Sequence, residues 1–122
     1  MHELDGIRIM NRTDGVVRPG HGSSTLREWI SAEDTGGRWS FGEVTAEPNE
    51  TVGTHLHPGE PEALIILDGH VELHGSAGIA QLGPGDVVFI PSDTEHGLRT
   101  PNGGLWLAIW PTRERVPGKR YA

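Results

Sequence analysis

Apolar and polar residues alternate with a period of two along much of the chain after residue 37, which predicts β-strands. Gly, Pro, Asn and Asp separate these segments, as tight turns require. The clearest case is 62–75, where Asp68-Gly69 lies between two β-rich arms and predicts a hairpin. Further strands are expected at 38–46, 51–57, 79–82, 87–91, 94–100 and 105–110.

Eight or nine short strands predict an all-β fold, either a sandwich or a barrel. Residues 1–34 form a less regular N-terminal arm with one or two edge strands; within it 25–31 fits a helical or an extended spacing, and we expect a strand. We expect the barrel at 35–112 and a solvated tail at 113–122.

Three of the expected strands are apolar at both odd and even positions: 63–67, 87–90 and 105–110. Both faces of such strands must be covered. Either an extra layer of this chain or a second copy would do so, and we expect a homodimer.

The composition narrows the class of protein. At 122 residues the chain is expected to be one domain, and its 18 glycines and 9 prolines suit short strands and turns. The net charge of −7 disfavours nucleic-acid binding, and no apolar run is long enough to cross a membrane. The chain has no cysteine, so a metal would need His and carboxylate ligands. We expect a cytoplasmic protein.

Three metal-capable side chains precede the apolar run that starts at residue 63. His55 and His57 are two apart, so on a strand both rings point to one face and can converge on one ion. Glu62 follows a Pro-Gly turn that can fold its strand back beside them. With seven histidines in the chain, a His-x-His pair alone is weak evidence for a metal site.

The spacing of these ligands and of further residues along the chain is stronger evidence than the His-x-His pair. His55, His57, Glu62 and Gly69 match the pattern Gly-x5-His-x-His-x(3 or 4)-Glu-x6-Gly, except that Asn49 stands where the first Gly is expected.

A second pattern, Gly-x5-Pro-x-Gly-x2-His-x3-Asn, is matched by Gly85, Pro91 and His96. Asp93 replaces its second Gly, and Asp tolerates turn conformations. Thr100 replaces the final Asn.

These two patterns are the motifs of the cupin superfamily, which the chain resembles over about residues 39–111. The resemblance implies a double-stranded β-helix, or jelly roll. It also implies one divalent transition metal held by His55, His57, Glu62 and His96. Iron is the expected ion, and manganese, nickel, zinc, cobalt and copper suit the same ligands.

The pocket around such a metal is expected to draw on several further side chains. We expect Trp39, Phe41, Arg99 and Trp106 to bind substrate, and Glu43 and Glu62 to act as catalytic carboxylates. The aromatic residues are equally compatible with plain core or a dimer interface, and Arg99 with an exposed position.

Other residues limit the chemistry or are expected elsewhere. Tyr121 and Lys119, the only residues of their types, lie in the tail, which disfavours reactions that need a barrel tyrosine or a Schiff base. His70 and His74 are expected on an exposed strand face with Glu72.

Three functions remain open. The first is a dioxygenase-like enzyme that acts on a small oxygenated organic molecule. The second is a redox-neutral isomerase, lyase or cyclase in which the metal is a Lewis acid. The third is a cupin that binds a small ligand without turnover. We expect the first.

Overall fold

Two facing antiparallel sheets form the body of the protein. The computed structural model describes residues 2–20 and 22–118. A six-stranded sheet contains, in spatial order, β10 (Val87–Ile90), β7 (Glu62–Gly69), β12 (Gly104–Pro111), β5 (Trp39–Ala46), β4 (Thr25–Ile30) and β3 (Val16–Pro19). A four-stranded sheet contains β6 (Glu50–His55), β11 (His96–Thr100), β8 (Val71–Gly75) and β9 (Gly78–Leu82).

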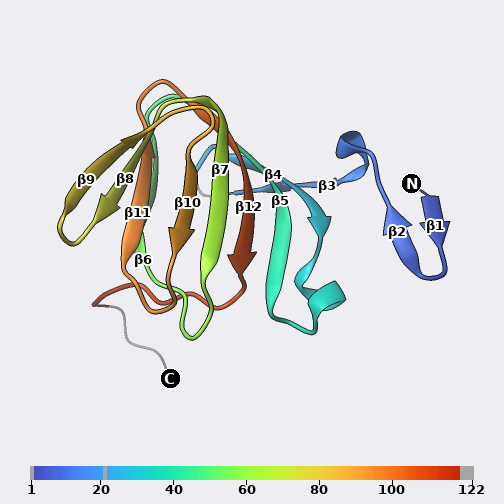
Figure 1. Ribbon diagram of the computed structural model, residues 1–122. Helices are drawn as coiled ribbons and strands as arrows, with labels where there is room; N and C mark the ends of the chain where they lie inside the picture. The colour runs from blue at the N-terminus through green and yellow to red at the C-terminus, as the bar shows by residue number, and fades with distance from the viewer. Residues whose placement is uncertain (1, 21, 119–122) are drawn as a thin grey trace.

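Two smaller features complete the fold. The hairpin of β1 (His2–Leu4) and β2 (Ile7–Ile9) projects away from the two sheets (Figure 1). The 3-10 turns η1 (Arg12–Asp14) and η2 (Ala32–Thr35) are the only helical segments among the described residues, and neither could span a membrane. The all-β prediction is therefore confirmed.

All strand pairings are antiparallel, and part of the expected arm belongs to the main sheet. The segment that could have been helical is β4, which pairs with β5. The strand prediction for 25–31 is thus confirmed.

The core lies between the two sheets. Its buried apolar side chains alternate with outward-facing residues along the strands, as the pleat of a strand requires. On β7, Leu64 is 4% exposed and Ile66 is 0% exposed, whereas Leu67 is 38% exposed. The full set of buried apolar residues is Val44, Ala46, Leu64, Ile66, Val71, Ile90, Leu98, Trp106 and Ala108.

The segment around Gly69 corrects the expected hairpin. β7 and β8 lie in different sheets and are not paired, so the chain crosses from one sheet to the other at this point. Gly69 has φ +86°, and a Cβ there would lie 2.5 Å from the Gly103 carbonyl oxygen. The sequence signal for a glycine turn was correct, but it marks a crossover with a close backbone approach rather than a hairpin.

Candidate metal centre

Both sheets contribute to one cluster of three histidines and a glutamate. His55 ends β6 and His96 begins β11, and their Cα atoms are direct partners in the four-stranded sheet. His57 follows two residues after His55. Glu62 begins β7 in the opposite sheet, so it does not come from a strand folded back beside β6.

The four side chains converge between the sheets. One ligand atom from each lies within 4.8 Å of those of the other three. The Glu62 Oε1 atom is 3.1 Å from Nε2 of His96 and 3.3 Å from Nε2 of His57. The three histidines are 4–6% exposed. The structure thus brings together all four expected metal ligands in a buried cluster.

Backbone carbonyls orient all three imidazole rings. The Nδ1 atoms of His55, His57 and His96 lie 2.8, 2.7 and 2.9 Å from the carbonyl oxygens of Gly53, Arg113 and Thr94, respectively. A carbonyl accepts only, so each Nδ1 donates, and loss of any proton from Nε2 on metal binding would leave its lone pair free for the ion. Such a second hydrogen bond is the usual way in which proteins orient metal-binding histidines.

Burial and hydrogen bonding perturb the acid–base behaviour of the cluster. Burial alone would raise the pKa of Glu62, but hydrogen bonds and charge from His57 and His96 outweigh it and lower that pKa to about 2. Burial likewise lowers the pKa of His57, yet Glu62 and the Arg113 carbonyl outweigh it and leave that pKa raised. Burial is the main cause of the lowered pKa of His55. Glu62 is therefore ionised at neutral pH, as a metal ligand must be.

The donor set fits a divalent transition metal. Two ligands bound at right angles, each about 2.1 Å from an ion, lie roughly 3 Å apart. The distances from Glu62 Oε1 to the two imidazole Nε2 atoms are close to that value. Three imidazole nitrogens and one carboxylate suit several first-row ions, so the residues do not identify which one is bound.

A cavity of about 110 Å³ adjoins the four ligands. Trp106, which is 3% exposed, lines it as expected. Ser24 and Leu26 come from the segment expected to be an arm, and Glu114 comes from the expected tail. The remaining lining residues are Val44, Val52, Leu98, Ala108 and Trp110.

Three residues of β5 lie elsewhere, which corrects their expected place in the pocket. Glu43 is buried and forms an ion pair with Arg12, and Phe41 packs on Trp29 with ring centroids 5.3 Å apart. Glu43, Phe41 and Trp39 are not among the cavity residues. The reason is strand alternation: the even positions of β5, such as Val44, face the core, so the odd positions face outward.

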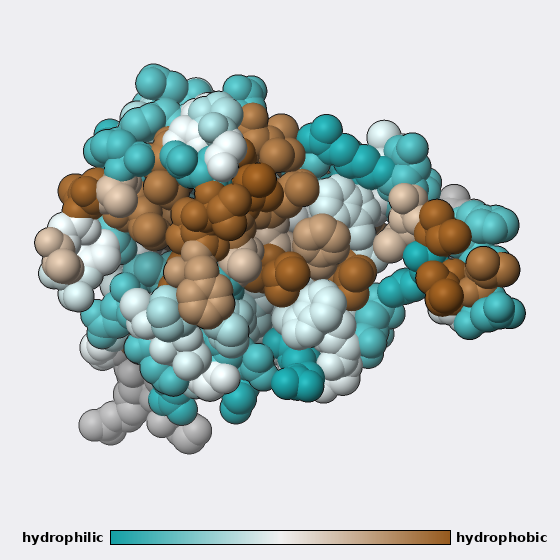
Figure 2. All heavy atoms as spheres, in the orientation of Figure 1, coloured by the Kyte–Doolittle hydropathy of each residue, from teal (hydrophilic) through white to brown (hydrophobic). Residues whose placement is uncertain are grey.

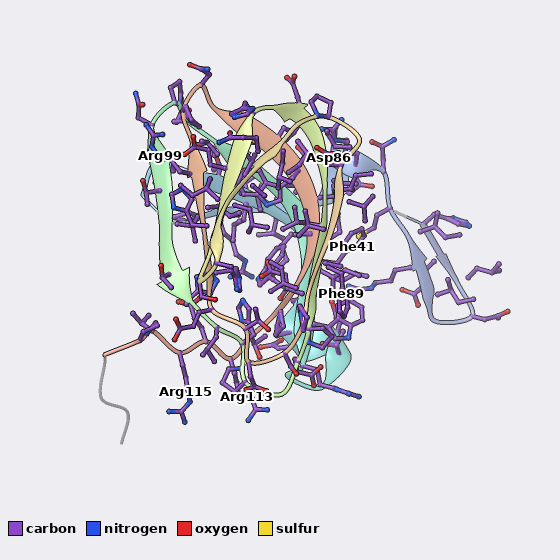
Figure 3. The ribbon with its side chains drawn as sticks, turned by 60° about the vertical axis from the view of Figure 1, so that its left-hand side comes forward. Phe41, Asp86, Phe89, Arg99, Arg113 and Arg115 are labelled. Atoms are coloured by element: carbon purple, nitrogen blue, oxygen red, sulfur yellow. The ribbon has the colours of Figure 1, made fainter. Side chains whose placement is uncertain are left out.

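Arg99 also lies outside the cavity. Its Nη1 donates to Glu72 Oε1 at 3.1 Å on the outer side of the four-stranded sheet, and Figure 3 shows it at the periphery. His74 lies beside the same carboxylate at 3.4 Å, and His70 contacts Gln81. Arg99 is therefore exposed, which is the alternative position expected from the sequence.

Sequence reasoning missed the contribution of residues 112–116, which we call the strap. The Arg113 carbonyl orients His57, and Glu114 lines the cavity. The charges of "TRERV" predict a solvated tail, and these residues are indeed exposed, but the segment also lies against the metal site. The available signal was their alternation, which in an extended segment puts Glu114 on the opposite side from both arginines.

Comparison with known families decides the relationship. A family model for the cupin domain matches residues 42–110, which is more than half of the chain. This protein is a cupin. The double-stranded β-helix and the family resemblance are thereby confirmed. Comparison with curated proteins found no match to this sequence.

Solved structures share this cupin's fold at low sequence identity. The polyketide cyclase RemF from Streptomyces resistomycificus is 24% identical with a TM-score of 0.75, and the match covers 93% of this chain and 87% of that one. A predicted oxalate decarboxylase from Thermotoga maritima is 22% identical with a TM-score of 0.74, covering 84% and 96%. An RmlC-like cupin from Shewanella frigidimarina is 14% identical with a TM-score of 0.73, covering 88% and 92%.

Proposed function

We propose that this cupin is a metal-dependent enzyme that acts on a small oxygenated organic molecule, with a dioxygenase-like reaction. The observation that carries the proposal is the buried cluster of His55, His57, Glu62 and His96 opening into a cavity. Four protein ligands leave room for further ligands on a first-row ion, which would supply Lewis acidity and, if it is iron, redox chemistry with dioxygen.

The residues of the chain would bind and shield the substrate. Trp106 and Trp110 offer flat apolar walls, and burial of the cluster excludes bulk water. The carbonyl hydrogen bonds fix the three imidazoles, so the ligand set is preorganised. Among the described cavity residues, the only carboxylate besides Glu62 is Glu114, so few protein groups are available for proton transfer. This scarcity favours chemistry in which the metal does most of the work.

A redox-neutral reaction is the second candidate. It is favoured by the structural likeness to a polyketide cyclase and by Glu114, a carboxylate that lines the cavity and could carry a proton. In this alternative, the metal polarises substrate oxygens without a change of oxidation state.

Elemental analysis combined with oxygen uptake tests the proposal. The protein is purified without a metal-affinity tag, its metals are measured, and uptake is followed with small diketones, hydroxyketones, catechols and sugar acids. We expect about one iron per chain and substrate-dependent uptake that is lost in His96→Ala. One zinc or manganese per chain without uptake would instead favour the redox-neutral reaction, and absence of any bound metal would contradict both.

A further inference from the structure

The strap is fixed beside the metal ligands on either side of Glu114. The Leu56 amide donates to the Arg115 carbonyl at 2.8 Å, and the Arg115 amide donates to the Leu56 carbonyl at 2.8 Å. One residue before Glu114, the Arg113 carbonyl accepts from Nδ1 of His57 at 2.7 Å. The position of Glu114 is therefore set by backbone contacts to the metal-site segment.

The charged side chains of the strap point alternately away from the cavity and toward it. Figure 3 shows the side chains of Arg113 and Arg115 pointing away from the barrel. Glu114, between them, lines the cavity. In an extended segment neighbouring side chains point to opposite sides, so the strap places Glu114, which remains exposed, at the mouth of the cavity and turns its two arginines away from it.

The described lining of the cavity therefore has a one-sided charge. Of the described residues, 2–20 and 22–118, those that line the cavity include two carboxylates, Glu62 and Glu114. None of these lining residues is a lysine or an arginine. A divalent ion would offset these two negative charges, since neutral imidazoles add none. An anionic ligand would meet no cationic side chain of this part of the chain and would be repelled by Glu114.

We propose that the metal cavity selects small uncharged oxygen ligands, such as hydroxyketones and diketones, and that Glu114 is the specificity-determining residue that rejects anions. The inference rests on the proposed function, because it concerns the ligand of the same metal. The cavity volume of about 110 Å³ limits the ligand to a small molecule.

Two pairs of nearly isosteric probes test the selection by charge. 3-Hydroxybutan-2-one is compared with lactate, and butane-2,3-dione with pyruvate; in each pair a methyl group replaces a carboxylate oxygen. Binding is followed by fluorescence, since Trp106 and Trp110 line the cavity. Metal-loaded and metal-free protein are both titrated, and the metal content of each sample is measured.

The decisive variant is Glu114→Gln, which keeps the size of the side chain and removes its charge. We expect it to raise the affinity for the carboxylate probes by roughly three- to tenfold, as removal of one partly screened charge near the ligand predicts. The affinity for the uncharged probes should change less than about twofold. Arg115→Gln is the matched control: it also changes the charge of the strap, but its side chain points away, so it should leave the ratio between the probes unchanged.

Two outcomes would overturn the proposal: equal changes for charged and uncharged probes in Glu114→Gln, or the same selective gain in Arg115→Gln. The metal analysis separates this failure from that of the proposed function. A metal-loaded protein without charge selection contradicts only the inference, whereas a protein that takes up no metal contradicts the proposed function. Charge selection in the metal-free protein would still support the role of Glu114.

A second inference comes from the outer face of the six-stranded sheet. Figure 2 shows apolar side chains gathered on this side of the molecule and again on the projecting hairpin. On the sheet, Val87 is 73% and Phe89 is 66% exposed; on the hairpin, Ile7 is 62% exposed. A groove on the sheet is lined only by apolar residues: Phe41, Ala63, Leu64, Ile65, Val87, Leu107, Ala108 and Ile109.

We infer that a second copy of this chain covers this face, with each hairpin lying against its partner. An isolated two-stranded hairpin is at best marginally stable in water. At about 150–200 Å² for a fully exposed large side chain, Leu4, Ile7, Ile9, Leu67, Val87, Phe89 and Ile109 leave roughly 700 Å² exposed. A standard interface buries about 800 Å² per partner, and an apolar patch can complement itself across a two-fold axis.

Light scattering over a range of protein concentrations tests this inference. We expect a dimer for the wild type, a monomer for Val87→Glu, and a weakened dimer for Ile7→Glu, since each variant puts a charge into the proposed interface. The matched control is Ile79→Glu: Ile79 is 58% exposed on β9 of the other sheet and should leave the dimer intact. A monomeric wild type, or a dimer that persists in folded Val87→Glu, would contradict the inference.

Discussion

Replacing His96 by alanine should lower the metal affinity more than about 100-fold, because loss of even an outer hydrogen-bond partner of a ligand typically costs 10- to 100-fold. His96 is 4% exposed, and its Nε2 lies 3.1 Å from Glu62 Oε1 within the four-ligand cluster. The strands that form the core remain, so we expect unchanged circular dichroism. Metal per chain and competition with a chelator measure the effect.

The free energy of unfolding of His96→Ala gives an independent test of the metal site. A metal present at 100 times its Kd stabilises the wild type by about 2.7 kcal/mol, and His96→Ala should gain almost none of this. His74→Ala is the matched control, because His74 pairs with the neighbouring Gly97 in the same sheet but lies 40% exposed on its outer side. If His96→Ala retained metal with wild-type affinity, the assignment of the site would be wrong.

Ile66→Ala should reduce the free energy of unfolding by about 2–5 kcal/mol, the range for truncation of a fully buried aliphatic side chain. Ile66 has no exposed surface, lies on β7, and its Cα pairs with that of Trp106 on β12. The total stability of a domain of this size is about 5–15 kcal/mol, so the loss would be a large fraction of it. Denaturant titration at a fixed protein concentration measures the change.

The control is the same substitution at an exposed isoleucine. Ile79 is 58% exposed on β9, and Ile79→Ala should cost less than about 1 kcal/mol. Equal losses at Ile66 and Ile79 would contradict the location of the core between the sheets.

The metal ligands were predictable because they depend on local spacing. His55 and His57 lie two residues apart, and the distances along the chain to Glu62 and His96 follow two recurrent patterns. The structure then adds what spacing cannot give: Glu62 reaches the cluster from the opposite sheet. Leu64 and Ile66 lie two and four residues after Glu62, so alternation along β7 puts them on the same face as this ligand, and both are in the core.

Which side of β5 faces the core could not be predicted, because the residue types on its two sides do not distinguish an inward from an outward side. Its outward side carries the larger aromatic residues Trp39 and Phe41, whereas its inward side is built from small residues and Val44. Large aromatic side chains normally indicate the core. Glu43 is buried on the outward side through its ion pair with Arg12, a contact between segments that no local pattern reveals.

The crossover at Gly69 was missed for a related reason. A glycine with positive φ suits a hairpin and a crossover equally, and the choice depends on the pairing partners of β7. These are β10 and β12, which are distant in sequence.

The central place of β12 has a consequence for biosynthesis. Chains are made from the N-terminus, yet β12, the last strand described, lies between β7 and β5, and the hydrogen bond to His57 comes from residue 113. While that segment is still in the ribosome, β5 and β7 each present an unpaired edge, which is prone to aggregation. The ligand set with all three oriented imidazoles is therefore complete only after the strap has been translated, so metal delivery is expected to follow synthesis of the strap.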